Sequence, residues 1–318
     1  MNCLVTGCAG FIGSNLVDFL LEKNHNVLGV DNLSTGKKLF LQKAFKYKNF
    51  NFLEIDLKDR KSLSNKLKNI DIVFHLSANA DVRNGLKNPD KDLNENTIVT
   101  YNILNAMRDQ NVNKIVFSST GSIYGDTDII PTPESSPFPI QTSLYGASKL
   151  ACEGLISAFS HGYNFQSWIF RFVGILGERY THGHIFDFYK KLLLDPRNIH
   201  ILGDGNQKKS YLNINDCLDA IYLAINNANN NINIFNLGLE DYCTVNDSLK
   251  WILNNLNLKP IVTYEGGKRG WIGDNPHIEL DISKIKKLGW KPKKNIKDSV
   301  IDTLNYLKEH KDIFFKYE

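Results

Sequence analysis

A glycine-rich turn near the start of the chain constrains its fold more than any other feature. Gly7, Gly10 and Gly13 follow the spacing G-x-x-G-x-x-G between an apolar run, Asn2–Thr6, and a helical pattern, Phe11–Glu22. Glycine is needed where such a turn is tight, where backbone approaches a pyrophosphate, and where helix packs on strand. The positive end of the helix would face the phosphates. The turn therefore predicts a dinucleotide site at the edge of a sheet.

The second apolar run supports the same interpretation. Asn26–Val30 leads directly into Asp31, about 20 residues beyond the turn, where an acidic side chain can accept hydrogen bonds from a ribose diol. A carboxylate at this place would repel a 2′-phosphate, so the sequence favours NAD over NADP.

Strand and helix patterns alternate through the first half of the chain. This rhythm predicts an α/β fold with a doubly wound parallel Rossmann sheet, and the near-continuous apolar strands fit burial on both faces. The further strands expected are Asn51–Ile55, Asp71–Leu76, Lys114–Ser118 and Phe165–Phe170, with the clearest helices at Asn94–Arg108 and Ser143–Ser160.

The rhythm loosens after Val173, where glycines, prolines and loops become denser. We expect a dinucleotide-binding domain of residues 1–173 plus 212–238. A smaller, mixed C-terminal substrate lobe would then comprise 174–211 plus 239–318. Further elements are expected at Asn215–Asn226 (helix), Asn233–Asn236 (strand), Asn246–Asn254 (helix) and Asn295–Lys308 (helix).

Bulk composition excludes several classes of protein. Hydrophobic residues make up 42% of the 318 residues and charged residues 23%, which are ordinary globular values, and the net charge of +4 is too small to argue for nucleic acid. Five cysteines without a C-x-x-C pair suggest free thiols in a reducing compartment. The N-terminal apolar stretch has no basic leader, and no run has the length of a membrane span. The cytoplasm is therefore the expected location.

A tyrosine and a lysine four residues apart form the candidate catalytic centre. Tyr145 and Lys149 would share one face of a helix that lies between the fifth and sixth strands. A free tyrosine titrates near pH 10, but a nearby ammonium and a positive nicotinamide ring would favour its phenolate. Thr120 follows the fifth strand, so its hydroxyl could hold the reacting oxygen near Tyr145.

Other residues near strand ends carry weaker signals. Leu76 and Ala78 lie at the end of the fourth strand, where ligands bind in such sheets. His75, just before them, is interpreted as a core histidine and not as a catalyst. Asp56 and Leu57 follow the third strand, and on their own they are interpreted as a turn residue and a core residue.

In this order, the motifs resemble those of the extended short-chain dehydrogenase/reductase superfamily, and within it the UDP-glucose 4-epimerase-like, NAD-dependent epimerase/dehydratase family. The resemblance covers essentially the whole chain. It rests on TGCAGFIG, HLSANADVR, SSTGSIYG, YGASK, RFVGILG, GDGNQKKSYLNINDCLDA and KRGWIGD…LGWKP.

The resemblance implies a bound NAD and an active site between two lobes. It implies that Tyr145 is the acid/base, that Lys149 orients the nicotinamide ribose, and that Thr120 is the hydroxyl partner. It places Phe11 and Ile12 near the pyrophosphate, Asp31 and Asn32 near the adenosine ribose, Asp56 and Leu57 near adenine, and Leu76, Ala78, Asn96 and Ser118 in the same cofactor site. A homodimer through the helices Asn94–Arg108 and Ser143–Ser160 follows by analogy.

Three departures from the family pattern limit the reaction and the substrate. Gly121 and Ser122 stand where the family's dehydratases carry an acidic pair, which disfavours a 4,6-dehydratase. Gly174 replaces an asparagine that meets the sugar nucleotide, and Lys209-Ser210 replaces Arg-Asp, so bidentate phosphate geometry is lost. The substrate contacts expected are Thr120, Ser122, Tyr145, His184, Lys209, Arg269 and Asp274. His182 and His184 suggest loop residues near the sugar and not a metal site, because no third ligand is visible.

Two reactions remain open at this point. A nucleotide-sugar 4-epimerase would remove hydride from C4 and return it to the other face of the sugar. A net 4-dehydrogenase would release a 4-keto product, and the departures could reflect a GDP-linked or unusual sugar such as a heptose. A non-catalytic nucleotide-binding regulator is a remote third hypothesis.

Overall fold

The computed structural model describes residues 1–63, 66–137, 140–271, 273–275 and 277–315. The chain divides into two compact units. Residues 126–137, 172–173, 212–220 and 236–238, which were predicted to belong to the dinucleotide-binding domain, lie in the second of these units. The functional labels given to the two domains stay predictions. Unit 1 is Met1–Gly125, Phe138–Arg171 and Ile221–Phe235, and unit 2 is Asp126–Pro137, Phe172–Ala220 and Asn236–Glu318.

A seven-stranded sheet forms the centre of unit 1, in the order β11-β6-β5-β4-β1-β2-β3. The pairs β1–β2, β1–β4, β2–β3 and β4–β5 are parallel. The chain runs outward from β1 in both directions, so the strand order reverses between β1 and β4, where doubly wound sheets bind ligands. The strands are β1 (Asn2–Thr6), β2 (Asn26–Asp31), β3 (Phe50–Glu54), β4 (Ile72–His75), β5 (Lys114–Thr120), β6 (Gln166–Phe172) and β11 (Ile232–Leu237). The predicted doubly wound Rossmann sheet is confirmed.

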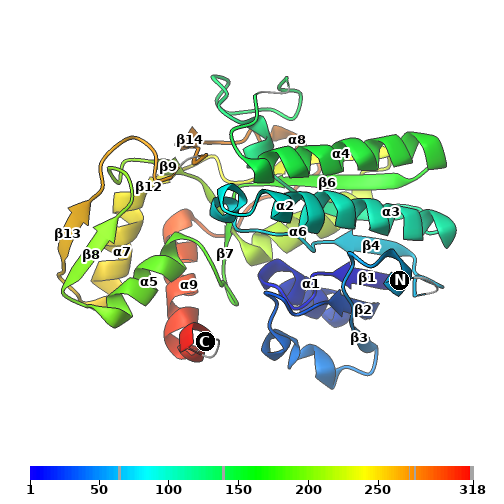
Figure 1. The fold of residues 1–318 in the computed structure, drawn as a ribbon, viewed down its shortest axis with the longest axis horizontal. Helices are drawn as coiled ribbons and strands as arrows, with labels where there is room; N and C mark the ends of the chain where they lie inside the picture. The colour runs from blue at the N-terminus through cyan, green and yellow to red at the C-terminus, as the bar shows by residue number, and fades with distance from the viewer. Residues whose placement is uncertain (64–65, 138–139, 272, 276, 316–318) are drawn as a thin grey trace. The chain divides into compact units, whose positions relative to one another are not determined.

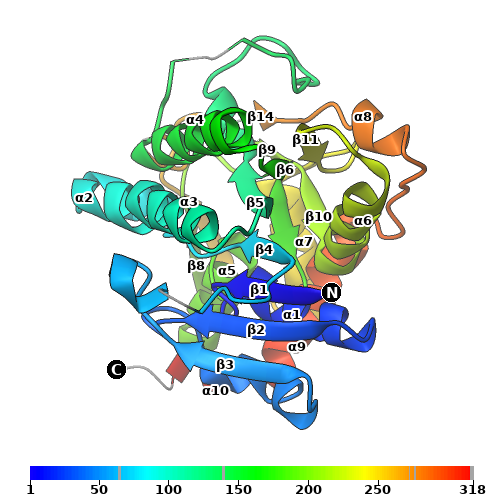
Figure 2. The same ribbon diagram turned by 90° about the vertical axis from the view of Figure 1, so that its right-hand side faces the viewer.

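Helices cover both faces of this sheet. Figure 2 shows α3 (Val99–Asp109) and α4 (Leu144–Tyr163) on one face and α1 (Phe11–Glu22) on the other. β4 is buried at every residue, and β5 is buried from Ile115 onward, because apolar side chains point into both layers. One core cluster therefore joins these strands to α3 and α4.

The predicted helix Asn94–Arg108 is more complex than its apolar pattern suggested. The chain forms α2 (Pro89–Asp92), then a π-helix (Leu93–Ile98), and only then α3. Wider π turns in a helix are rare and often lie at functional sites. Here the π segment carries Asn96, whose buried side chain contacts the neighbouring α4.

Unit 2 is built from short strands and from helices that pack together. Its helices α5, α7 and α9 contact one another and can be followed in Figure 1. Side chains cap two of them: Thr244 forms a capping box with Asp247 at α7, and Asn295 caps α9.

The elements of unit 2 were largely missed by the sequence analysis between residues 174 and 211. The strands are β7 (Gly174–Leu176), β8 (Asn198–Ile201), β9 (Lys208–Lys209), β10 (Tyr211–Asn213), β12 (Cys243–Thr244), β13 (Ile261–Tyr264) and β14 (His277–Ile278). The helices are α5 (His184–Leu194), α6 (Ile214–Asn227, which runs into unit 1), α7 (Val245–Leu256), α8 (Ser283–Lys286), α9 (Ile296–Glu309) and α10 (Asp312–Phe315). The strands pair as β10-β7, β12-β9-β14 and β13-β8.

Two predictions about composition can be compared with the structure. All five cysteines are free and buried, as the absence of a C-x-x-C pair suggested. Among the described residues, no helix is both long enough and apolar enough to span a bilayer.

Candidate active site

The glycine turn between β1 and α1 admits no side chain at two of its three positions. Gly7 has φ +67°, and a Cβ there would lie 2.8 Å from the amide nitrogen of Ser77. A Cβ on Gly13 would lie 2.0 Å from the carbonyl oxygen of Gly7. Gly10 precedes α1, and in this described part of the chain no side chain caps the helix and no acidic residue occupies its first turn. Phe11 and Ile12 open the helix, so the first turn fits the pyrophosphate of a dinucleotide.

Asp31, at the end of β2, is tied to this turn by its carboxylate. Its two oxygens accept hydrogen bonds from the backbone N–H groups of Ala9 (2.9 Å) and Leu33 (2.8 Å). Burial raises the pKa of this carboxyl, and the two backbone hydrogen bonds oppose that shift. A Cβ on Gly36 would lie 2.7 Å from Asp31 Oδ1, so the glycine leaves room for the carboxylate. The acidic group is thus held at the carboxyl end of the strand, and its contact with a ribose diol stays a prediction.

Replacing Asp31 by asparagine should weaken NAD binding and reduce the preference for NAD over NADP. The neutral amide loses the charge, and its NH₂ group would face at least one backbone N–H donor. Hydrogen bonds to a charged group contribute about 1.5–3 kcal/mol, so we expect roughly 10- to 150-fold weaker NAD binding. Calorimetric titration with each dinucleotide measures both effects. An unchanged affinity ratio would contradict the proposed role of Asp31.

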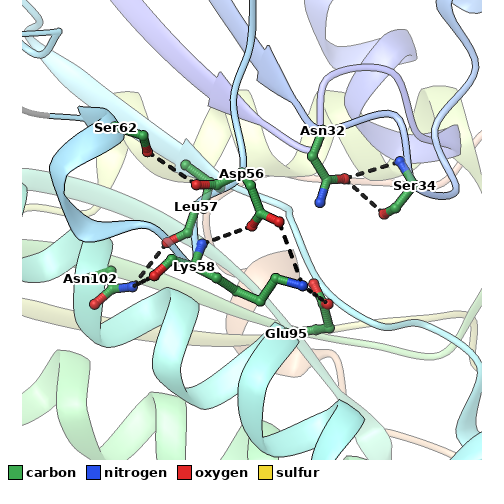
Figure 3. A network of polar contacts seen from close by, with 8 residues as sticks. All are labelled: Asn32, Ser34, Asp56, Leu57, Lys58, Ser62, Glu95 and Asn102. Atoms are coloured by element: carbon green, nitrogen blue, oxygen red, sulfur yellow. Dashed lines mark hydrogen bonds and ion pairs between the residues drawn. The ribbon is translucent and has the colours of Figure 1, made fainter.

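Polar contacts organise the ends of β2 and β3, as Figure 3 shows. Asn32 accepts hydrogen bonds from the backbone N–H (3.1 Å) and the hydroxyl (2.7 Å) of Ser34. Asp56 accepts one from the N–H of Lys58 (2.9 Å), and Lys58 Nζ also contacts Glu95 (2.8 Å). The Asp56 carboxylate is exposed, and its hydrogen bond to the N–H of Lys58 fixes it in a turn. Leu57 is buried, and its carbonyl accepts a hydrogen bond from Asn102 (2.9 Å).

The loop after β4 is fixed by Thr6 of β1. Its hydroxyl oxygen accepts hydrogen bonds from the N–H groups of Leu76 and Ser77 at 3.2 Å each. This places Leu76 and Ala78, both half-buried, beside the glycine turn. His75 is fully buried between the hydroxyls of Thr6 (2.8 Å) and Thr100 (3.0 Å), and burial lowers its pKa to about 3. The prediction of a core histidine is confirmed.

Asn96 connects the π-helix to the loop after β4 and to α4. Its side-chain oxygen accepts a hydrogen bond from the N–H of Asn79 (2.7 Å), and its NH₂ group donates to Ser148 Oγ (2.8 Å). Ser148 in turn donates to the carbonyl of Tyr145 (2.8 Å). Asn96 is therefore linked, through Ser148, to the turn of α4 that carries the candidate catalytic tyrosine.

Thr120, Tyr145 and Lys149 come together at the ends of β5 and α4. The Thr120 hydroxyl lies beside the phenol of Tyr145 and favours its ionised form. The same hydroxyl donates to Ser122 Oγ (3.2 Å) and accepts from the N–H of Ser122 (3.1 Å). Lys149 Nζ donates to the carbonyl of Ser118 (2.8 Å) and lies 4.7 Å from the ring centroid of Phe117. The sequence spacing thus predicted a real cluster, which joins the last residues of β5 to the first turns of α4.

The electrostatics of this cluster differ from the expectation in one respect. Burial raises the pKa of Tyr145 to about 12, and the neighbouring Thr120 hydroxyl offsets only part of that shift. Burial also lowers the pKa of Lys149 to about 8. Besides burial, the groups that shift the pKa of Tyr145 are Thr120, Asp92 and Cys152, so the lysine does not by itself favour the phenolate. A positive charge next to the phenol is still needed for a base at neutral pH.

Three of the predicted substrate residues in unit 2 form ion pairs. Lys209 Nζ lies 2.7 Å from the carboxylate of Asp274, which is 3% exposed. Arg269 pairs with Asp126 (2.7 Å) and donates to the carbonyl of Asp274 (2.6 Å). The predicted proximity of Arg269 and Asp274 is therefore found, although the partner of the guanidinium is another carboxylate. A diphosphate would have to compete with Asp126 and Asp274 for these two cations.

His184 is not the loop residue that the sequence suggested, because it opens α5. Its ring nitrogens hydrogen-bond Ser248 (2.7 Å) and Tyr211 (3.0 Å), and burial lowers its pKa to about 3. Tyr211 also explains the glycine at position 174, since a Cβ on Gly174 would lie 2.7 Å from the Tyr211 ring. His182 is exposed and stacks on Tyr180. Among the described residues, no group of three potential metal ligands is found.

One buried pair next to the catalytic cluster escaped the sequence analysis. Glu153 of α4 and Arg171 of β6 form an ion pair with N···O 2.8 Å. The available signal was an arginine inside the otherwise apolar strand WIFRF, which has to find a buried partner.

Comparisons with known proteins agree with this arrangement. The model of the NAD dependent epimerase/dehydratase family matches residues 3–238. A putative UDP-glucose 4-epimerase of Methanocaldococcus jannaschii is 34% identical over 313 residues, which cover 96% of this chain and 98% of that protein.

Solved structures of related enzymes have the same fold over almost the whole chain. A crystal structure of UDP-galactose 4-epimerase aligns with TM-score 0.87 and 33% identity, covering 97% of this chain and 99% of the other. The UDP-glucuronic acid 4-epimerase of Bacillus cereus, in complex with UDP-glucuronic acid and NAD, aligns with TM-score 0.88 and 26% identity, with the same coverage. The chain therefore belongs to the NAD dependent epimerase/dehydratase family and is an enzyme whose cofactor is NAD.

Proposed function

We propose that the protein is a nucleotide-sugar 4-epimerase acting on a UDP-linked sugar. The observation that carries the proposal is the cluster in which the Thr120 hydroxyl lies beside the phenol of Tyr145, with Lys149 one helical turn away. The related proteins named above are 4-epimerases of UDP-sugars by their descriptions, which supports both the position of reaction and the nucleotide.

The residues of this chain have distinct tasks in the proposed reaction. Tyr145 takes the proton from the C4 hydroxyl and later returns it, while Thr120 hydrogen-bonds the reacting oxygen and keeps it near the phenol. The glycine turn Gly7–Gly13, Asp31 and Lys149 would hold NAD, which would supply a reversible acceptor for the C4 hydrogen and its electron pair, open to either face of the sugar. Lys149 lies one turn along α4 and holds the nicotinamide ribose by its ammonium. Ser122 stands where the family's dehydratases carry a carboxylate, so this chain offers no carboxylate there for eliminating water.

The substrate side of the proposal rests on the resemblance and on charge. We assign Lys209 and Arg269 to the diphosphate because they are cations in neighbouring segments joined through Asp274. His184 is assigned to the sugar. The departures Gly174 and Lys209 leave a GDP-linked or otherwise unusual sugar as the alternative substrate. The homodimer and the cytoplasmic location stay predictions.

A panel of UDP-, GDP-, CDP- and dTDP-sugars tests the proposal. NADH absorbance and product mass are followed for each sugar. A 4-epimer of equal mass with no lasting NADH signal supports the epimerase. A product lighter by two hydrogens, with NADH accumulating, indicates a net 4-dehydrogenase instead. Lack of reaction with every UDP-sugar would overturn the proposed substrate class.

A further inference from the structure

A buried ion pair joins the sheet of unit 1 to the helix that carries the catalytic residues. Arg171, at the end of β6, donates from Nε to Glu153 Oε1 (3.1 Å) and from Nη2 to Oε2 (2.8 Å). The side chain of Arg171 is 5% exposed and that of Glu153 is 6% exposed. Taking two charges out of water is costly, and buried pairs replaced by apolar residues often leave proteins equally stable. Stability alone is therefore a weak reason for this pair.

The other contacts of the pair reach both sides of Thr120. Ser119, the residue before Thr120, donates its hydroxyl to Glu153 Oε1. Arg171 Nη1 donates to the hydroxyl of Tyr124 (2.7 Å), and its guanidinium lies 5.0 Å from the Tyr124 ring centroid. Tyr124 ends the short 3₁₀ turn Gly121–Tyr124 that begins directly after Thr120. The segment that carries the Thr120 hydroxyl is thus fastened at both ends.

The same pair also fixes α4. Glu153 follows Lys149 by four residues, so both side chains lie on one face of the helix. Lys149 contacts the carbonyl of Ser118 at 2.8 Å, and Glu153 contacts the hydroxyl of Ser119. Two successive turns of α4 therefore bind two successive residues of β5. This double attachment sets where the first turn of α4, with Tyr145, stands relative to Thr120.

We propose that Glu153 and Arg171 are positioning residues, which hold the Thr120 hydroxyl beside the phenol of Tyr145 without touching the substrate themselves. The inference rests on the proposed roles of Thr120 and Tyr145 in the reaction. The ion pair then serves to position Thr120 relative to Tyr145. An apolar pair in its place can restore folding, but it does not restore the reaction.

Four variants separate geometry from stability. Glu153→Gln leaves the buried guanidinium without its counter-charge and should lower the melting temperature. The double variant Glu153→Met/Arg171→Met removes both charges and should melt above Glu153→Gln, because no buried charge is left unpaired. Its kcat should nevertheless fall about 100-fold, the order expected for a small misplacement of reacting groups. Its KM should change less than about threefold, because no substrate contact is removed.

The third and fourth variants serve as controls for this comparison. Ser119→Ala removes one attachment and should give a smaller loss of kcat. Ser160→Ala is the matched control, because it also removes a buried hydroxyl from α4. The Ser160 hydroxyl contacts Ser167 of β6 (3.2 Å) and not the segment that carries Thr120. It should leave kcat unchanged.

Hydrogen–deuterium exchange provides a readout that does not depend on turnover. In the double variant, amides of residues 118–124 should exchange faster, while those of β1, β2 and β4 should not. A double variant with wild-type kcat, or with unchanged exchange at 118–124, overturns the positioning role. A wild-type protein that converts no nucleotide sugar would overturn the proposed function, and the exchange result would still decide whether the pair holds the Thr120 segment.

Discussion

Replacing Tyr145 by phenylalanine is expected to lower kcat by roughly 100- to 10,000-fold, the range that general acid–base groups contribute. The change deletes one hydroxyl group, the one that lies beside the Thr120 hydroxyl. NAD binding and the melting temperature should stay close to those of the wild type, because the ring and its packing are kept. Single-turnover measurements with a nucleotide sugar, alongside a titration with NAD, check both parts of the expectation.

Tyr163→Phe is the matched control for this experiment. Tyr163 is the last residue of the same helix, and it is 48% exposed. The same chemical change there should leave turnover unaltered. If Tyr145→Phe kept its activity, Tyr145 could not be the acid/base, and another group would have to move the proton.

The second large effect is expected at Gly13, where alanine should destabilise the protein and abolish tight NAD binding. The added methyl would lie 2.0 Å from the carbonyl oxygen and 2.8 Å from the carbonyl carbon of Gly7. Both are backbone atoms, which cannot rotate away as a side chain can, so α1 has to shift from the turn. Overpacking of this kind costs about 1–3 kcal/mol and occasionally more. Urea denaturation and NAD titration measure the two losses.

Gly154→Ala provides a control with the opposite sign. Gly154 is exposed within α4, and a Cβ there meets no atom within 4 Å. Alanine in a helix interior is favoured over glycine by about 0.5–1 kcal/mol. We therefore expect a small gain in stability and unchanged NAD affinity. If both alanine variants had the same stability and the same NAD affinity, the close approach of backbone at Gly13 would not be the reason for its glycine.

Local sequence patterns predicted the sheet well because each signal lies within a few residues. The apolar runs at β1 and β4 and the turn Gly7–Gly13 are such signals, and so is the spacing of Tyr145 and Lys149. The predicted ends of these elements differ from the structure by only a few residues; β6, for example, runs from Gln166 to Phe172 where Phe165–Phe170 was predicted.

Features that depend on distant partners could not be predicted in this way. His184 is a half-buried helix residue whose ring nitrogens hydrogen-bond Tyr211 and Ser248, which lie 27 and 64 residues away. Lys209 meets Asp274 across 65 residues. The strand β9 has only two residues, too few for a periodic pattern. The π-helix at Leu93–Ile98 is defined by backbone bonding, which an apolar pattern does not reveal.

The burial of Lys149 has a consequence for the pH dependence of folding. Its pKa falls from 10.5 to about 8 in the folded chain, so the unfolded chain binds more protons between these values. Stability therefore rises with pH across that window, and below about pH 8 the buried ammonium opposes folding in full. The lysine proposed to hold the nicotinamide ribose thus makes the folded protein less stable at neutral pH. A buried cation that lowers the stability of the fold is best explained by selection for activity at this position.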